Sequence, residues 1–248
     1  MKLLIDIGNS RIKWACLRDG RLEDPEVLAY KDRDRAELFE RVMQVKERPD
    51  QVWIANVAGE DIGIGLTSAI RNEWKIAPVF ARVEPECKGV TNAYHDITQL
   101  GIDRWLSVVA GWVRYRAPVC VVSCGTALTI NGVSDTGRHL GGLIVPGLHM
   151  MQAALIRETS GIKAEPGDDF TIEFGVSTAE CVNYGAVRAL VSVVDHVAVE
   201  MAERYGQALR RIITGGYAGQ VNALLANKFD HDPHLVLNGL AIVAEKAT

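Results

Sequence analysis

Apolar positions follow one of two spacings along most of the chain. In some stretches they form short runs or alternate with polar residues, as in a strand; in others they recur every three or four residues, as in a helix. In the first half, the strands expected from this pattern cover residues 2–7, 11–17, 26–30, 51–56 and 77–81. The helices expected there cover residues 35–45, 61–74 and 101–115. Strands that alternate with helices predict an α/β fold.

The opening order of elements returns in the second half. Strands are expected over residues 119–123, 127–133, 139–145 and 210–213. Helices are expected from about residue 148 and over residues 178–205, 217–226 and 236–244. The polar residues 158–174, with Gly and Pro among them, predict a long loop. Each half begins as strand, glycine turn, strand, turn, strand, and this repeat predicts two related halves, residues 1–116 and 117–248.

Composition and charge exclude several classes of protein. The chain carries 27 basic and 31 acidic side chains, interspersed and with a net charge of −4, so no surface for nucleic acid or an anionic membrane is expected. The first apolar run is interrupted by Asp6, well short of a membrane span, and shows no signal-peptide pattern, so we expect a cytoplasmic protein without a membrane partner. The five scattered cysteines include no C-x-x-C pair, which indicates buried free thiols.

Three glycine turns follow predicted strands. The first reads DIGNS from Asp6, the second reads CGTA with Gly125 and Thr126, and the third reads TGG at Gly215 and Gly216. Backbone N–H groups at such turns can hold phosphate oxygens, and an acid ahead of the turn can hold Mg²⁺ through water. A carboxylate at the end of a buried strand also needs a cationic or hydrogen-bonding partner. Each turn taken alone is also typical of a hairpin or of a strand-to-helix bend.

The order of these turns resembles phosphate loop one, phosphate loop two and the adenosine loop of the acetate and sugar kinase, heat-shock ATPase and actin superfamily. The resemblance implies a duplicated ribonuclease-H-like fold with ATP in a cleft between the halves. Within that superfamily, the chain resembles the type III pantothenate kinases through DIGNSRIKW, NAYHDITQLGIDRW, CGTALTING, HLGGLIVPG, STAECVNYG and TGG. The resemblance implies ATP-dependent phosphorylation of pantothenate, the first step of coenzyme A synthesis, by a homodimer.

The same resemblance implies a set of site residues. Those for ATP are Asp6, Ile7, Gly8, Asn9, Ser10, Arg11, Ile12, Lys13, Gly125, Thr126, Gly215 and Gly216. Mg²⁺ would accompany ATP and be held at Asp6 through water. Those for pantothenate are Tyr94, Gly101, Ile102, Asp103, Arg104 and Thr178.

Asp103 and Arg104 suit phosphoryl transfer to an alcohol. The carboxylate can accept the hydroxyl proton, and the guanidinium can grip the carboxylate or amide of pantothenate. By spacing alone, an adjacent acid and base are more typical of a solvated pair at a helix N-terminus, and Thr178 is more typical of a helix cap. The resemblance favours the catalytic role for Asp103 and the substrate-binding roles for Arg104 and Thr178.

Position 123 departs from the family pattern. Where the family usually reads Asp-x-Gly-Thr-Ala, this chain has a serine, Ser123, so the acid that ligates K⁺ or NH₄⁺ in relatives is missing. A hydroxyl offers a dipole where the ion favours a full negative charge. We therefore expect activity without a monovalent cation, with the backbone or Lys13 supplying part of the missing field.

Two other functions remain open at this point. A non-catalytic member of the same fold, such as an accessory factor for transcription, would bind ligand without turnover, but it would have no need of a base at Asp103. A small-sugar kinase or an ATP-driven conformational switch would use the same nucleotide loops. The 248 residues leave no room for the large insertions of heat-shock ATPases and actin, which argues against the switch.

Several residues invite other interpretations. His139 stands beside a glycine pair, yet we expect a surface or satisfied polar residue rather than a catalytic one. The stretch DHDPH, with His231 and His234, is expected to be a solvated loop rather than a metal site. The helix over residues 101–115 carries Trp105 and Trp112 on more than one face, which fits a dimer interface or burial inside a monomer equally well. The resemblance favours the dimer.

Overall fold

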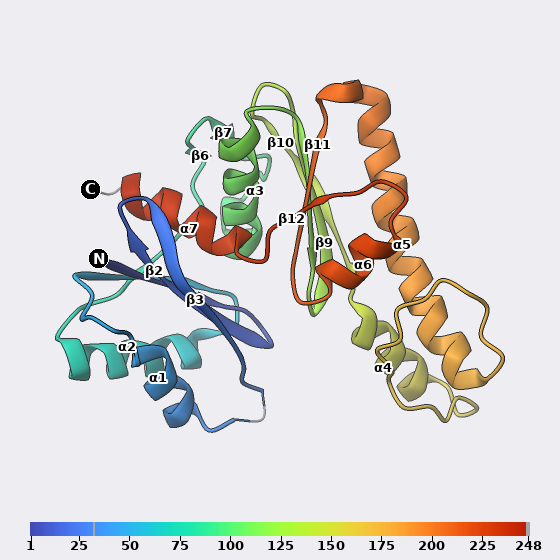
Figure 1. Ribbon diagram of the computed structural model, residues 1–248, viewed down its shortest axis with the longest axis horizontal. Coiled ribbons are helices and arrows are strands. Elements are labelled where there is room, and N and C mark those ends of the chain that lie inside the picture. Colours follow the sequence, from blue (N-terminus) through green and yellow to red (C-terminus); the bar gives the residue numbers. More distant parts are fainter. Residues whose placement is uncertain (32, 247–248) are drawn as a thin grey trace. The chain divides into compact units, whose positions relative to one another are not determined.

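The computed structural model describes residues 1–31 and 33–246 and has the expected α/β architecture (Figure 1). The chain forms two compact units. Unit 1 contains residues 1–110 and the C-terminal segment from residue 234, and unit 2 contains Gly111–Pro233. The C-terminal helix thus belongs to the same unit as the N-terminal sheet. The predicted division between residues 116 and 117 placed that helix in the second half.

Unit 1 is built on a five-stranded sheet in the order β3-β2-β1-β4-β5. Its strands are β1 (Lys2–Ile7), β2 (Arg11–Arg18), β3 (Arg21–Ala29), β4 (Gln51–Asn56) and β5 (Val79–Phe80). Strand β1 pairs with β2 in the antiparallel sense and with β4 in the parallel sense. Strand β3 begins earlier than the expected residue 26, because Asp19 and Gly20 both have positive φ angles and form a tight two-residue hairpin turn.

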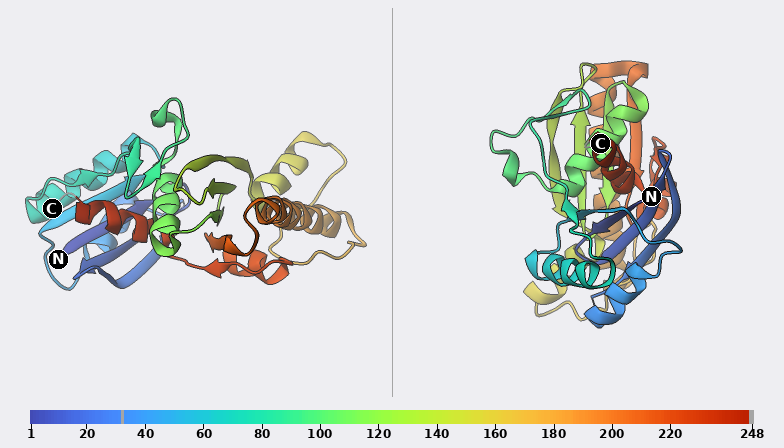
Figure 2. Two further views of the ribbon diagram at one scale, coloured as in Figure 1. Left: turned by 90° about the horizontal axis from the view of Figure 1, so that it is seen from above. Right: turned by 90° about the vertical axis from the view of Figure 1, so that its left-hand side faces the viewer.

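Three helices cover the two faces of this sheet: α1 (Arg35–Met43), α2 (Glu60–Trp74) and α7 (Leu235–Lys246). Helix α3 (Ile102–Tyr115), also labelled in Figure 1, begins in unit 1 and ends in unit 2. Leu3, Ile5 and Ile7 of β1 share one hydrophobic core with α1 and α2. Because side chains alternate along a strand, Asp6 points to the other face, on which α7 packs. The two ends of the chain, β1 and α7, therefore lie side by side (Figure 2).

Three short elements of unit 1 were not anticipated from the sequence. They are β6 (Glu86–Cys87), β7 (Val90–Thr91) and the 3₁₀ turn η1 (Ile97–Gln99). Strands of two residues are too short for alternation to mark them.

Unit 2 repeats the sheet of unit 1. Its strands are β8 (Val119–Cys124), β9 (Ala127–Val133), β10 (His139–Pro146), β11 (Arg210–Thr214) and β12 (Asp230–His231). They are arranged as β10-β9-β8-β11-β12, and β8 is antiparallel to β9 and parallel to β11. Both sheets thus have the order 3-2-1-4-5 with the same strand directions, which confirms the predicted duplication of a ribonuclease-H-like domain.

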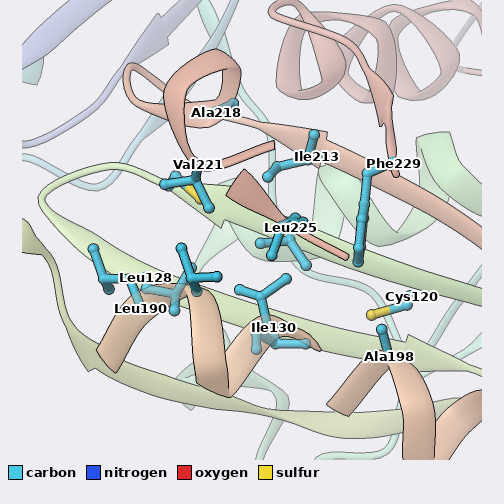
Figure 3. Packing of buried hydrophobic residues seen from close by; sticks show 14 of the residues in the cluster. Cys120, Leu128, Ile130, Leu190, Ala198, Ile213, Ala218, Val221, Leu225 and Phe229 are labelled. Atoms are coloured by element: carbon cyan, nitrogen blue, oxygen red, sulfur yellow. The ribbon is translucent and has the colours of Figure 1, made fainter. Parts of the chain in front are cut away.

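One face of this second sheet is covered by helices. They are α4 (Leu148–Glu158), α5 (Thr178–Tyr205) and α6 (Ala218–Leu224), and the 3₁₀ turn η2 (Gly206–Ala208) follows α5. Figure 3 shows Leu190 and Ala198 of α5, with Ala218 and Val221 of α6, meeting the strand side chains in one core. Cys120, Val122 and Cys124 of β8 belong to this core, so the side chain of Ser123 lies on the opposite face of the sheet.

Several expectations about individual residues need correction. The DHDPH stretch is not a solvated loop: Asp230–His231 forms β12, and Asp232 is buried and ion-paired with Arg114 at 2.5 Å. His139 is fully buried, which excludes the surface position and leaves the other expected alternative, a satisfied polar residue. All five cysteines are free, as expected, but Cys181 is exposed and Cys16 is half-buried.

Helix α3 is buried along much of its length. Trp105, Leu106, Val109 and Trp112 are all buried within the single chain. The apolar side chains of this helix are therefore already covered by the rest of the chain, so they do not by themselves indicate a dimer interface. Among the described residues, no helix is both long and apolar enough to cross a membrane.

Candidate functional site

The first predicted phosphate loop is the turn between β1 and β2. Gly8 N–H donates to the carbonyl of Arg11 at 3.0 Å, and the hydroxyl of Tyr30 donates to the carbonyl of Gly8 at 2.6 Å. The N–H of Tyr30 donates to the carbonyl of Ser10 at 3.3 Å. Three carbonyl oxygens of the turn thus accept hydrogen bonds inside unit 1, and these bonds fix the backbone of the turn.

Asp6 stands at the end of β1, just ahead of this turn. It is only 7% exposed and lies opposite Lys13 in the sheet register. The pKa of Asp6 is raised to about 7: burial is the largest cause, the positive charge of Lys13 opposes it, and the nearby Asp103 adds to it. Two acids from distant segments, Asp6 and Asp103, therefore lie close enough in unit 1 to interact electrostatically.

The chemistry of Asp6 fits a bound cation. A buried carboxylate with a raised pKa regains its charge when a cation binds beside it. The described residues contain no cluster of three or more His, Cys, Asp or Glu side chains that could hold a metal by themselves. This donor set suits Mg²⁺ that is bound by one or two carboxylates, water and substrate phosphates, rather than a metal held in a protein cage.

Asp103 and Arg104 occupy the first turn of α3. Burial raises the pKa of Asp103, although its Oδ1 accepts a 2.8 Å hydrogen bond from the N–H of Arg104, which lowers it. Arg104 is only 6% exposed, and its Nη1 donates to the phenol oxygen of Tyr94 at 2.8 Å. The two side chains do not form the solvated pair that spacing alone would favour. The structure brings together Asp6, Lys13, Tyr94, Asp103 and Arg104.

Gly101 gives the Asp103 carboxylate its space. A Cβ atom added at Gly101 would lie 2.7 Å from Oδ1 of Asp103, which is closer than real Cβ contacts. Ile102, between them, is buried. The glycine of the Gly-x-Asp-Arg element thus has a steric role toward the acid that follows it.

The second and third predicted loops pack together in unit 2. Gly125 N–H donates to the carbonyl of Ala127 at 3.0 Å, the counterpart of the Gly8 bond in unit 1. Gly215 has a φ angle of +106°, and a Cβ added there would lie 2.3 Å from the carbonyl oxygen of Cys124. Only glycine can approach the second loop so closely. Gly216 and Thr126 are exposed beside this contact.

Gly147 is a site residue that the sequence interpretation missed. Its N–H donates to the carbonyl of Thr126 at 3.1 Å, and an added Cβ would lie 2.4 Å from that oxygen. Gly147 thus packs against the backbone of the second predicted phosphate loop and donates a hydrogen bond to it. The sequence contains this glycine in the Pro-Gly pair that ends HLGGLIVPG, but the same pair is typical of an ordinary strand-to-helix turn.

Ser123 lies in a row of three hydroxyl side chains. Strand register places it directly beside Thr129 of β9 and Thr214 of β11, on the face away from the helix-covered core. The hydroxyl oxygens of Thr129 and Thr214 are buried, and neither has a hydrogen-bond partner. This part of the site therefore presents neutral hydroxyls.

Thr178 is exposed at the first position of α5. The cap of this helix is Ser177, whose Oγ accepts from the N–H of Glu180 at 3.3 Å. Capping is thus performed by the neighbouring serine. Thr178 belongs to unit 2, whereas the other residues predicted for pantothenate belong to unit 1.

Comparison with known proteins identifies relatives over the whole length of the chain. The profile of the family described as type III pantothenate kinase matches residues 2–200. The type III pantothenate kinase of Nitrosococcus oceani is 37% identical over 99% of this chain and 94% of its own length. That of Alcanivorax borkumensis is 36% identical over 99% of both.

Solved structures with lower identity share the fold. A Campylobacter jejuni protein assigned to the Baf family of transcriptional activators superposes with a TM-score of 0.60 and 22% identity, over 99% of this chain and 98% of its own. A protein from Sinorhizobium meliloti assigned as a 2-dehydro-3-deoxygalactonokinase gives 0.57 and 12%, over 100% and 99% of the two chains. These similarities support the actin-like ATPase and sugar kinase fold.

Proposed function

Because this chain belongs to the type III pantothenate kinase family, we propose that its two groups of site residues divide the work of phosphoryl transfer. The chain phosphorylates pantothenate with ATP, in the first step of coenzyme A biosynthesis. Residues of unit 1 act on the alcohol that receives the phosphoryl group. The glycine turns hold the nucleotide. The observation that carries this proposal is the proximity of two acids, the buried Asp6 and the half-buried Asp103, in one polar site of unit 1.

Asp103 is the proton acceptor. Phosphoryl transfer needs a base within reach of the attacking hydroxyl, and a carboxylate whose pKa is raised by burial accepts a proton more readily than a solvated one. The proton of the pantothenate hydroxyl passes to a carboxylate oxygen of Asp103 as the hydroxyl oxygen attacks the γ-phosphorus of ATP. The bond from that phosphorus to the β,γ-bridging oxygen breaks, and ADP is the leaving group. Gly101 keeps room for that carboxylate, and Ile102 places it at the start of α3.

Arg104, Tyr94 and Thr178 bind pantothenate. Arg104 supplies the charge for the substrate carboxylate or amide, and the hydroxyl of Tyr94 orients the guanidinium. Thr178, exposed at the start of α5 and not needed as its cap, offers a neutral donor and acceptor.

The nucleotide is held by three turns. The segment from Asp6 to Lys13 and the pair Gly125 and Thr126 bind the phosphates, and Gly215 and Gly216 leave room for the adenosine. Asp6 would hold Mg²⁺, largely through water. When bound, that ion neutralises charge on the phosphates, while Asp6 itself keeps the ion beside the first turn.

No monovalent cation is required in this proposal. Ser123, Thr129 and Thr214 provide dipoles rather than charge, so K⁺ or NH₄⁺ would bind only weakly beside them. Lys13, opposite Asp6 in the sheet, supplies a fixed positive charge near the first turn.

The enzyme acts as a cytoplasmic homodimer. Support for the dimer comes from individual apolar side chains of unit 2 that are exposed to solvent in the single chain. Phe174 and Val176, just before α5, are 92% and 95% exposed, and Leu143 and Ile144 are exposed on the edge strand β10. A monomeric mass in light scattering at micromolar concentration would contradict the dimer.

A coupled assay tests the function directly. The purified chain is incubated with MgATP and, in separate reactions, with pantothenate and a panel of small sugars, and ADP release is measured. We expect ADP release only in the reaction that contains pantothenate as the acceptor. Turnover with a sugar would assign a different acceptor, and nucleotide binding without any turnover would indicate an accessory protein.

A further inference from the structure

A chain of hydrogen bonds joins helix α4 to the proposed adenosine turn. His149 of α4 lies with Nε2 2.6 Å from the phenol oxygen of Tyr217, the residue directly after Gly215 and Gly216. The two rings meet edge to face, with centroids 5.6 Å apart. All of these residues belong to unit 2.

The buried side of this network determines which nitrogen of His149 carries hydrogen. Nε2 of Gln152 donates to the carbonyl of Gly167 at 2.9 Å and to Oδ1 of Asn183 at 2.5 Å. Its Oε1 therefore faces Nδ1 of His149, at 3.2 Å. An amide oxygen can only accept, so Nδ1 carries the hydrogen. In the neutral ring Nε2 is then an acceptor, and the hydroxyl of Tyr217 donates to it.

The same network holds a short segment of the long loop before α5. Gly167 is bonded by Gln152, and the carbonyl of Asp169 accepts from Asn183 at 2.9 Å. The ring of Phe170 packs on that of Tyr217, with centroids 5.4 Å apart. Gln152 and Asn183 are both buried, so these bonds are protected from water.

Tyr217 also touches the second phosphate loop through its backbone. Its N–H donates to the carbonyl of Cys124 at 3.1 Å, the same oxygen against which Gly215 packs. A displacement of Tyr217 would therefore move the two glycines beside it. Its position depends on both a backbone bond and the side-chain bond to His149.

We infer that His149 is a positioning residue for ATP, which acts through the hydroxyl of Tyr217 on the Gly215–Gly216 turn. This inference rests on the proposal that the turn holds the adenosine. His149 contacts the turn only through Tyr217, so its contribution should be to nucleotide affinity rather than to the chemical step.

The test is a double-mutant cycle read on both Michaelis constants. Tyr217→Phe keeps the ring against Phe170 and removes only the hydroxyl, and His149→Ala removes the acceptor. Each variant is expected to raise KM for ATP about tenfold, the size of one hydrogen bond, with kcat and KM for pantothenate changed less than about twofold. The double variant is expected to resemble the single ones, because both changes break one bond.

Two variants serve as matched controls. Asp168→Asn changes an exposed acid whose Oδ1 lies 3.2 Å from Nε2 of His149 but leaves the histidine and the hydroxyl of Tyr217 in place, so KM for ATP should stay near the wild-type value. His196→Ala removes an exposed histidine from α5, and no kinetic constant should change. Thermal melting of every variant identifies any loss of fold, and the conservative Tyr217→Phe change decides the question if His149→Ala unfolds.

The outcomes separate this inference from the proposed function. If the wild type binds ADP in calorimetry and phosphorylates pantothenate, but Tyr217→Phe leaves KM for ATP unchanged or raises both Michaelis constants equally, the positioning role is wrong. Additive penalties in the double variant would also overturn it. If the wild type neither binds ADP nor phosphorylates pantothenate, the proposed function fails and the inference fails with it.

Discussion

Nη1 of Arg104 donates a 2.8 Å hydrogen bond to the phenol oxygen of Tyr94, and the guanidinium carbon lies 5.8 Å from the centre of the same ring. The tyrosine thus contacts the buried arginine through its hydroxyl and its aromatic ring. The N–H of Tyr94 is itself held by Oδ1 of Asn92 at 2.9 Å. An arginine held in this way presents its remaining donors in a defined direction.

Tyr94→Phe should therefore weaken pantothenate binding without abolishing turnover. The ring remains, but the hydroxyl that orients Arg104 is lost, so KM for pantothenate is expected to rise about five- to tenfold, with kcat nearly unchanged. Arg104→Lys should have a larger effect, since a lysine cannot make a bidentate contact. Steady-state kinetics with varied pantothenate measures both effects. An unchanged KM in both variants would contradict the assignment of this pair.

Asp103→Asn should abolish most of the turnover. The amide keeps the shape and hydrogen bonding of the side chain but has no basic oxygen, so kcat should fall by roughly 10²–10⁴, as for other lost general bases. The melting temperature should not fall. Asp61→Asn, an exposed acid in the first turn of α2, is the matched control and should be fully active. Substantial turnover in Asp103→Asn would show that another group takes the proton.

Gly101→Ala should impair catalysis through Asp103. The added methyl group would lie 2.7 Å from the carboxylate oxygen, so either the carboxylate or the helix start must move. A small displacement of a catalytic group is costly, and kcat is expected to fall at least about tenfold. Gly161→Ala adds a methyl group where no atom lies within 4 Å, and it should leave kcat unchanged. Equal activity of the two variants would rule out the steric role of Gly101.

The stability of the protein without nucleotide should depend on pH through Asp6. The carboxyl has a pKa of about 7 when folded, against an ordinary value of 3.8, so the folded state holds a proton that the unfolded chain has lost. Its contribution to stability is therefore full below pH 4 and is lost as pH rises toward 7, by up to about 4 kcal/mol.

Asp6→Asn should remove this pH dependence. The variant is expected to melt at a higher temperature than the wild type at pH 8, and to gain less stability from MgATP. Melting curves between pH 5 and pH 8, with and without MgATP, provide the measurement. If the stabilities of the wild type and of Asp6→Asn changed by the same amount between pH 5 and pH 7, the proposed role of Asp6 would be wrong.

Turnover should be independent of K⁺ and NH₄⁺. The hydroxyls of Ser123, Thr129 and Thr214 offer no full negative charge to such an ion. Rates in K⁺, NH₄⁺ and Tris-only buffers are expected to agree within about twofold for the wild type, whereas Ser123→Asp should create a response to the ion. A strong, saturable K⁺ requirement in the unchanged protein would mean that other groups hold the ion.

The sequence by itself determined the elements and the three glycine turns. Most of the longer strands and helices lie close to their predicted bounds, because alternation and helical spacing are properties of neighbouring residues. The early start of β3 and the short elements were not predicted. The repeated order of elements was likewise sufficient to predict two related sheets. The family motifs contain Asp103 and Arg104 as adjacent residues, so both site residues could be named without knowing where their side chains point.

Only the tertiary structure decided how these residues meet. Asp6 and Asp103 are separated by most of unit 1 in the sequence, and their mutual repulsion exists because β1 and the first turn of α3 belong to one folded unit. The need for glycine at Gly147 and Gly215 arises from backbone atoms of the second phosphate loop, far away along the chain. Burial and close approach depend on contacts between distant segments, and no local pattern of hydrophobic and polar positions records those contacts.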